Sequence, residues 1–293
     1  MRHLLRIAHG PRRALRAFAL VAAAFAPLAT TFAPPPAVAA PPCEPIDYLA
    51  VALPETDEPV RAALALAYPN IVFRNDGDAL SFDGKTWLEL GTAEDRPPAQ
   101  VLANPSIVEQ FAYTYPIAFD LEPRRRAFAD PGRPRNDAFF RALYFGDAEA
   151  ASNSTTVVRE PRLANARFTV TTKRNVDCQL RAALSEIANE PSHVRFFENP
   201  AGGFNWRTIS GTDRLSSHSF GAAIDINAEL GQYWKWTGAT EGRVGAYKNL
   251  VPEALVRAME RRGFIWGGKW NHFDGMHFEY RPELILHGRM VSG

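Results

Sequence analysis

The sequence contains very few cysteines, with only Cys43 and Cys178 among its 293 residues. A structural zinc site is closed by four ligands, usually thiolates, so two cysteines argue against such a site. An even pair without a second metal-like spacing predicts one disulfide, formed in an oxidising compartment. It would close a loop of about 135 residues and stabilise the fold by roughly 4 to 5 kcal/mol in the chain-entropy model. The alternative is two free buried thiols.

The sequence also lacks an excess of one charge, because 33 Lys and Arg face 32 Asp and Glu. Five of the arginines lie in residues 1–39, which contain no acidic residue, so residues 40–293 carry a formal net charge of −4. A mildly acidic body argues against a protein that binds nucleic acid by neutralising phosphates. With 46% hydrophobic and 22% charged residues, the chain is neither a disordered polymer nor a collagen-like fibre.

A membrane span of ordinary length is missing from the N-terminus, where residues 17–29 form an almost wholly apolar run. That run is too short to span a bilayer comfortably. Arginines precede it, and the small residues Ala37 and Ala39 follow it at the positions that a signal peptidase inspects. We therefore predict a signal peptide in residues 1–39, cleavage near Ala39 and export to the periplasm or the medium, with no membrane span in the mature chain. The alternative is an uncleaved N-terminal anchor.

No internal repeat, low-complexity linker or long charge run divides residues 40–293. Helical spacing appears in residues 58–67, 105–113, 137–144, 178–188 and 252–262. Strand-like alternation appears in residues 71–74, 79–90, 167–172, 222–227 and 276–280. Because strands and helices do not alternate regularly, the pattern predicts an α+β fold with a small antiparallel sheet flanked by helices. We expect residues 191–293 to hold the chemistry and residues 40–190 to form a region of unknown role packed on it.

The first chemical motif is a polar loop that runs into an alternating strand at residues 222–227. On this strand Asp225 faces away from the apolar side chains, because side chains alternate with period two. A carboxylate on a short apolar strand costs free energy unless it is paired or binds a cation. His218 lies seven residues earlier, and Gly221 permits the bend that returns its imidazole toward Asp225. The two side chains can then converge on one metal ion.

The second motif lies about fifty residues later, where His277 and Glu279 share the face of a strand opposite the core. His277 would complete a set of two imidazoles and one carboxylate, which leaves a fourth position for water, as in catalytic zinc sites. Two acids are candidates for the general base. Glu279 faces the same way as His277, whereas Asp274 precedes Gly275 on a turn that can fold over the metal. The spacing leaves this choice open.

Together the two motifs resemble the LAS zinc metallopeptidases, which cut peptidoglycan, and within them the D-alanyl-D-alanine carboxypeptidase family. The resemblance covers roughly residues 205–279 and rests on Ser216-x-His218-x-x-Gly221-x-Ala223-x-Asp225 followed by Asp274-x-x-His277-Phe278-Glu279. Relatives of the carboxypeptidase type carry Glu where this chain has Asp274. Asp at that place, Phe278 and the preceding Trp-Gly-Gly-Lys-Trp are closer to the L-alanyl-D-glutamate endopeptidase branch.

The resemblance implies that His218, Asp225 and His277 are the zinc ligands. It also implies that Asp274 is the base. Glu279 then orients a ligand or fixes its strand.

Family members also use an arginine upstream of the first ligand to hold the scissile carbonyl as negative charge develops. Arg207 is the preferred candidate and Arg214 the alternative. Ser216 is a candidate substrate-binding residue, or it supports the loop or a ligand by hydrogen bonding.

The function expected from the resemblance and from export is a zinc peptidase that hydrolyses amide bonds in peptidoglycan stem peptides. Its target bond is of the D-Ala-D-Ala or the L-Ala-D-Glu type. The alternative is a zinc-containing binding module of the same fold that attaches to the cell wall with little or no hydrolysis.

Overall fold

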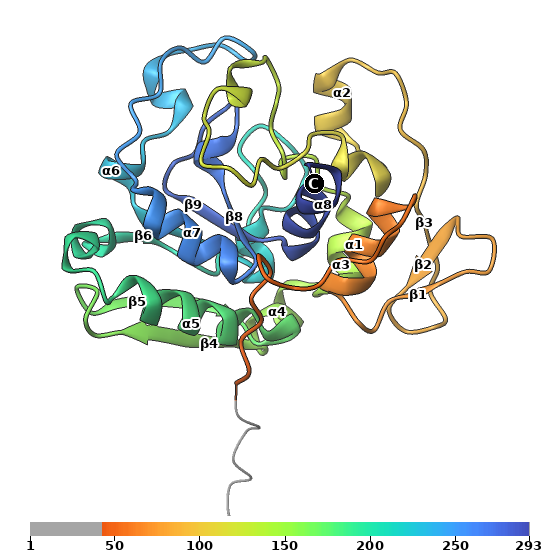
Figure 1. Ribbon diagram of the computed structural model, residues 1–293, viewed down its shortest axis with the longest axis horizontal. Helices are drawn as coiled ribbons and strands as arrows, with labels where there is room; N and C mark the ends of the chain where they lie inside the picture. The colour runs from red at the N-terminus through yellow and green to blue at the C-terminus, as the bar shows by residue number, and fades with distance from the viewer. Residues whose placement is uncertain (1–42, 293) are drawn as a thin grey trace, which may run out of the picture. The chain divides into compact units, whose positions relative to one another are not determined.

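The computed structural model describes residues 43–292, so the predicted signal peptide lies outside the described residues. They form mixed helices and small antiparallel sheets (Figure 1), which confirms the predicted α+β class. The strands are β1 Val72–Phe73, β2 Ala79–Ser81, β3 Leu88–Glu89, β4 Thr155–Glu160, β5 Ala166–Thr171, β6 Pro200–Gly202, β7 Ala223–Asn227, β8 Phe264–Trp266 and β9 His277–Tyr280. The α-helices are α1 Pro59–Ala67, α2 Pro98–Ala103, α3 Asp137–Leu143, α4 Ala148–Ser152, α5 Val176–Ile187, α6 Ala228–Gly231, α7 Glu253–Arg261 and α8 Pro282–Ser292.

The central sheet has four strands in the order β6-β7-β9-β8, and every neighbouring pair is antiparallel. In the pairing of β7 with β9, Asp225 lies opposite His277 and Ile224 lies opposite Phe278. Residues directly opposite each other on one face of a sheet have close Cβ atoms. This register brings the two sequence motifs together.

Most predicted elements form close to their predicted bounds. The exception is residues 105–113, for which the prediction of an α-helix is wrong. This segment forms only the short 3-10 helix η1 Val108–Phe111. Residues 79–90 form two short strands joined by a turn in which Asp83 accepts the backbone N–H groups of Lys85 and Thr86. Strands β4, β6 and β8 and helices α2, α4, α6 and α8 are not among the predicted elements.

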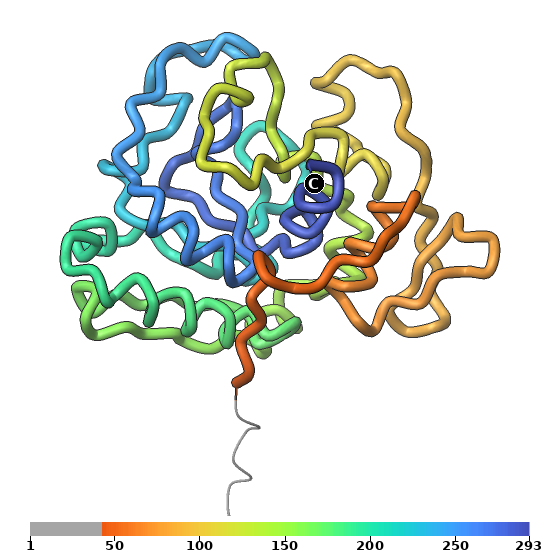
Figure 2. Tube along the Cα trace, viewed as in Figure 1, coloured from red at the N-terminus to blue at the C-terminus, as the bar shows by residue number. Residues whose placement is uncertain are grey.

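The main hydrophobic core contains residues from both the first and the second half of the described chain. Helix α5 packs on the β4–β5 hairpin and against α7 (Figure 1). Helices α1 and α8 lie side by side although they stand near opposite ends of the described chain (Figure 2). The division of function near residue 190 stays a prediction.

One disulfide joins Cys43 to Cys178 in α5, as the cysteine count predicts. It ties the beginning of the described chain to the helix that covers the β4–β5 hairpin. Among residues 43–292, no helix is long and apolar enough to cross a membrane.

Candidate metal centre and its cleft

His218 lies on the short 3-10 helix η5 Ser217–Phe220, directly before strand β7. The hydroxyl oxygen of Ser216 accepts the backbone N–H of His218 at 3.4 Å at the start of this turn. Gly221 ends it with φ +64°, and a Cβ atom there would lie 2.6 Å from the backbone nitrogen of Thr171. Only glycine suits both the left-handed conformation and this close approach. The bend predicted at Gly221 is therefore present.

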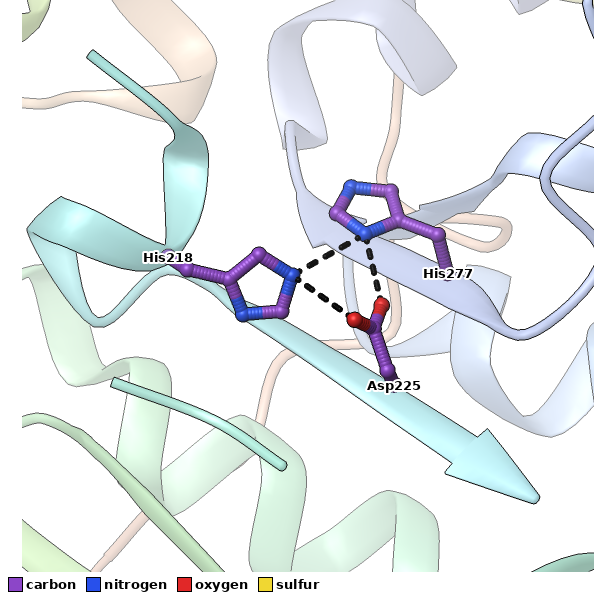
Figure 3. A group of neighbouring side chains, drawn as sticks. All are labelled: His218, Asp225 and His277. Atoms are coloured by element: carbon purple, nitrogen blue, oxygen red, sulfur yellow. Dashed lines mark hydrogen bonds and ion pairs between the residues drawn. The ribbon is translucent and has the colours of Figure 1, made fainter. Parts of the chain in front are cut away.

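The side chains of His218, Asp225 and His277 converge on one point (Figure 3). The Nε2 atom of His218 lies 3.2 Å from Asp225 Oδ2, and the Nδ1 atom of His277 lies 2.9 Å from Asp225 Oδ1. The two facing ring nitrogens are 3.3 Å apart. These three residues are the predicted ligand set, and the pairing of β7 with β9 brings them together.

The outer nitrogen of each imidazole has an acceptor that orients the ring. His218 Nδ1 lies 2.8 Å from the carbonyl oxygen of Gly203, and His277 Nε2 lies 3.3 Å from Glu279 Oε2. If the outer nitrogens carry the protons, the inner nitrogens turn lone pairs toward each other and toward Asp225. Two lone pairs and a carboxylate at this distance repel one another unless a cation lies between them.

The donor set fits a zinc-type ion. Four ligands at about 2.0–2.1 Å in a tetrahedron stand roughly 3.3 Å from one another, close to the observed separations. Burial lowers the pKa of His277, but hydrogen bonds to Asp225 and Glu279 outweigh burial and raise the pKa to about 10. A metal ion bound by the Nδ1 atom of His277 would have to displace the proton that these hydrogen bonds favour.

Glu279 is fully buried, and Arg135, just before α3, reaches its carboxylate. Its carboxylate accepts hydrogen bonds from Arg135 at 2.8 Å and from Arg281 at 3.2 Å. Burial raises the pKa of Glu279, but Arg135, His277 and Arg281 together hold it well below its usual range. A carboxylate so strongly paired is a poor proton acceptor, and its contact with His277 orients that imidazole.

Asp274 lies on the turn that leads into β9, where the backbone N–H of His277 donates to the carbonyl oxygen of Asp274 at 3.1 Å. At the next position, Gly275, a Cβ atom would lie 1.9 Å from the carbonyl oxygen of Gly231. The Oδ1 atom of Asp274 has no hydrogen-bond partner within residues 43–292. Burial raises the pKa of Asp274 to about 6. Its carboxyl group lines the same cavity as the three converging side chains.

This cavity has a volume of about 300 Å³ and a cationic wall. Its charged lining residues besides Asp225 and Asp274 are Arg133, Arg135, Arg207 and Lys235. Ser216 lines it as well. Arg214 lines only the adjoining cavity of about 580 Å³, which shares Arg133 and Lys235 with the first. Burial and the neighbouring Arg135 and Arg133 lower the pKa of Arg214 to about 10, which reflects the crowding of positive charge.

Sequence reasoning missed Arg133 and Arg135, which lie more than eighty residues before His218. Each guanidinium group is held through one nitrogen: Arg133 donates to the carbonyl oxygen of His272 at 2.8 Å, and Arg135 donates to Glu279. No motif marks either residue in the sequence. Only the packing of their segment over the central sheet brings them to the cavity.

A family model described as D-alanyl-D-alanine carboxypeptidase matches residues 210–280, about a quarter of the chain. The matched segment contains the three converging side chains and Asp274. Comparisons with curated proteins and with solved structures find no match. The similarity of residues 210–280 to this family supports the interpretation of the chain as a peptidase of the D-alanyl-D-alanine carboxypeptidase type.

Proposed function

We propose that this protein is an exported, zinc-dependent peptidase that hydrolyses amide bonds in peptidoglycan stem peptides. The observation that carries the proposal is the convergence of His218, Asp225 and His277 on a cavity that Asp274 also lines, inside the segment that matches the peptidase family.

His218, Asp225 and His277 would hold the zinc ion. Zinc supplies Lewis acidity, lowering the pKa of a water molecule that it binds and polarising an amide carbonyl. The carbonyl oxygen of Gly203 and the carboxylate of Glu279 keep the two imidazoles in the orientation that this role requires.

Asp274 is the proposed general base and, later in the reaction, the general acid. As water attacks the amide carbon, the carboxylate takes one of its protons. The carboxylic acid then gives that proton to the amine as the C–N bond breaks. A pKa of about 6 suits both steps near neutral pH, because the group is mostly ionised before the attack and still acidic enough to protonate the amine.

Arg207 is the proposed partner of the amide oxygen, since it lines the cavity of the metal centre and Arg214 does not. Stem peptides carry free carboxylates, which suit the positive wall formed by Arg133, Arg135 and Lys235. Ser216 supports the ligand loop through its hydrogen bond to the backbone of His218, and its place in the cavity also suits contact with substrate.

Export is part of the proposal. It rests on the signal-peptide pattern in residues 1–39 and on the disulfide between Cys43 and Cys178, since disulfides persist in oxidising compartments. Stem peptides are found outside the cytoplasmic membrane, which agrees with that location.

The proposal is tested by incubating the purified protein with muropeptides and analysing the products by mass spectrometry. A carboxypeptidase releases a single D-Ala, whereas an L-Ala-D-Glu endopeptidase shortens the peptide from within. Removing the metal with a chelator should abolish either reaction, and adding zinc should restore it.

The variant Asp274→Asn should lower the rate by about 10²- to 10⁴-fold. Its zinc content should be unchanged, because Asp274 is not one of the proposed ligands. The exposed Asp213→Asn, changed in the same way, is the matched control and should keep full activity. Equal rates for the wild type and Asp274→Asn would refute the assigned base. A wild type that binds zinc and muropeptides without cleaving them would favour the alternative, a cell-wall binding module.

A further inference from the structure

Arg124 is a buried cation that forms no ion pair within residues 43–292. It lies on the 3-10 helix η2 Pro123–Arg125, and its residue is only 6% exposed. Its Nε and Nη2 atoms have no hydrogen-bond partner within residues 43–292. The adjacent acid, Glu122, forms its ion pair with Arg125 instead, at 3.0 Å.

Two aromatic rings hold the Arg124 guanidinium group in place. Its Cζ atom lies 5.1 Å from the ring centre of Tyr247 and 5.3 Å from that of Phe273. Such cation–π contacts replace only part of the hydration that a buried guanidinium group loses. The penalty shows in the pKa of Arg124, which burial lowers. A buried charge in this condition is stabilised by an anion.

A cavity of about 660 Å³ lies beside Arg124, between residues 121–125 and the loop 242–247. Three arginines line it, Arg124, Arg125 and Arg243, against one acid, Glu122, which is already paired. Asn271 lines it as well. None of its lining residues lines the cavity of the metal centre, so the two cavities are separate.

We infer that this second cavity is a binding site for an oxyanion, a carboxylate or a phosphate group, with Arg124 as the central ligand and Arg243 as a second cation. Guanidinium groups bind carboxylate and phosphate oxygens through charge-assisted hydrogen bonds. Because the aromatic rings already fix Arg124, an arriving anion does not have to order its side chain. The inference stands independently of the proposed peptidase activity.

The site also adjoins the segment that carries the proposed base. The ring of Tyr247 stacks on Phe273 at a centroid distance of 4.5 Å, and Phe273 directly precedes Asp274. A ligand bound to Arg124 would therefore lie close to Phe273, next to the turn that carries Asp274. An anionic molecule or polymer that contacts the protein at both cavities would be held at two points.

The test measures thermal unfolding of the purified protein while sodium phosphate, or in a second arm sodium acetate, replaces sodium chloride at constant pH and ionic strength. A site that binds only the folded state gives a saturable rise in Tm. We compare the wild type with Arg124→Met, which keeps an apolar side chain against the two stacked rings, and with Arg243→Gln, an exposed position whose change should not disturb folding. The exposed Arg126→Gln, which does not line the cavity, is the matched control.

We expect the half-saturating anion concentration to rise about tenfold in Arg124→Met and about threefold in Arg243→Gln, with Arg126→Gln unchanged. The arm with the lower half-saturating concentration in the wild type identifies phosphate or carboxylate as the preferred group. The inference is overturned if neither anion gives a saturable rise in the wild type. It is also overturned if Arg124→Met and Arg243→Gln have the same half-saturating anion concentration as the wild type. The same holds if that concentration rises in Arg126→Gln as much as in these two variants. If Arg124→Met fails to fold, the half-saturating anion concentration of Arg243→Gln alone tests the inference: a rise over the wild type supports it and no change overturns it.

Discussion

His277, a candidate metal ligand, shows at the scale of one residue how an imidazole is held in one orientation. Its two ring nitrogens have different tasks: Nδ1 faces Asp225 and His218, while Nε2 is held by Glu279. Glu279 is held in turn by Arg135 and Arg281. The orientation of the His277 ring thus depends on Glu279 and on the two buried arginines paired with it, and each of these contacts can be tested separately.

Glu279 should make the free energy of unfolding depend on pH in the acid range. Its folded-state pKa is depressed below the value of about 4.3 expected in the unfolded chain. Its contribution is therefore fully present above about pH 4.3 and is lost as the pH falls toward the folded-state pKa. Glu279→Gln should lower the free energy of unfolding at pH 7 by about 3 kcal/mol, because it leaves two buried arginines without their shared partner.

Urea unfolding between pH 7 and pH 3 checks this prediction. The free energy of unfolding of Glu279→Gln should fall less steeply below about pH 4.3 than that of the wild type. The exposed Glu89→Gln, which removes a surface ion pair with Arg74, should change it by less than about 1 kcal/mol. Parallel curves for the wild type and Glu279→Gln below pH 4.3 would contradict the depressed pKa.

At the scale of elements, the site is a junction between β7, β9 and the two turns that precede them. η5 presents His218 and the Asp274–His277 turn presents Asp274, and both turns depend on a glycine at a position of close contact. Strand propensity and motif spacing predicted β7 and β9 because their alternation is local. The helix expected in residues 105–113 became a single 3-10 turn, whose residue Gln110 accepts the backbone N–H of Asn136 through its side chain.

Gly275→Ala should test the close approach behind the Asp274 turn. The added methyl group meets the backbone oxygen of Gly231, which cannot move aside as a flexible side chain can. We expect a loss of about 1–3 kcal/mol in the free energy of unfolding, together with lower activity because the turn shifts Asp274. Gly146→Ala, where a Cβ atom meets nothing within 4 Å, should stay within about 0.5 kcal/mol of the wild type. Denaturant unfolding of both variants measures these changes. Equal free energies of unfolding for Gly275→Ala and the wild type would show that the Gly231 backbone moves aside.

At the scale of the whole described chain, the first and second halves share one main core, and the disulfide between Cys43 and Cys178 adds a covalent link across it. Long-range contacts of this kind hold α1 against α8 and α5 against α7. Cutting the link should therefore loosen the start of the described chain without changing the fold of the central sheet.

The double variant Cys43→Ala/Cys178→Ala should lose about 2–5 kcal/mol in the free energy of unfolding, because the unfolded chain is no longer restricted by the crosslink. Its Tm should not respond to a reducing agent, whereas that of the wild type should fall. If the protein binds zinc as proposed, its zinc content should stay the same in both proteins, since the proposed ligands lie on other elements. A wild type whose Tm is insensitive to complete reduction would show that the crosslink adds no stability.

The sequence by itself determined the candidate donor set: the identity of His218, Asp225 and His277, the turns and strands on which they lie, and the place of Asp274 three residues before His277. These features are local, and alternation along a strand or a glycine at a bend decides them. Only the tertiary structure decided the register of β7 against β9, the carbonyl oxygen that orients His218, and the arrival of Arg133 and Arg135 at the cavity. The same holds for the unpaired Arg124. Contacts between residues far apart in the chain depend on how whole elements pack, and no periodicity in the sequence encodes that packing.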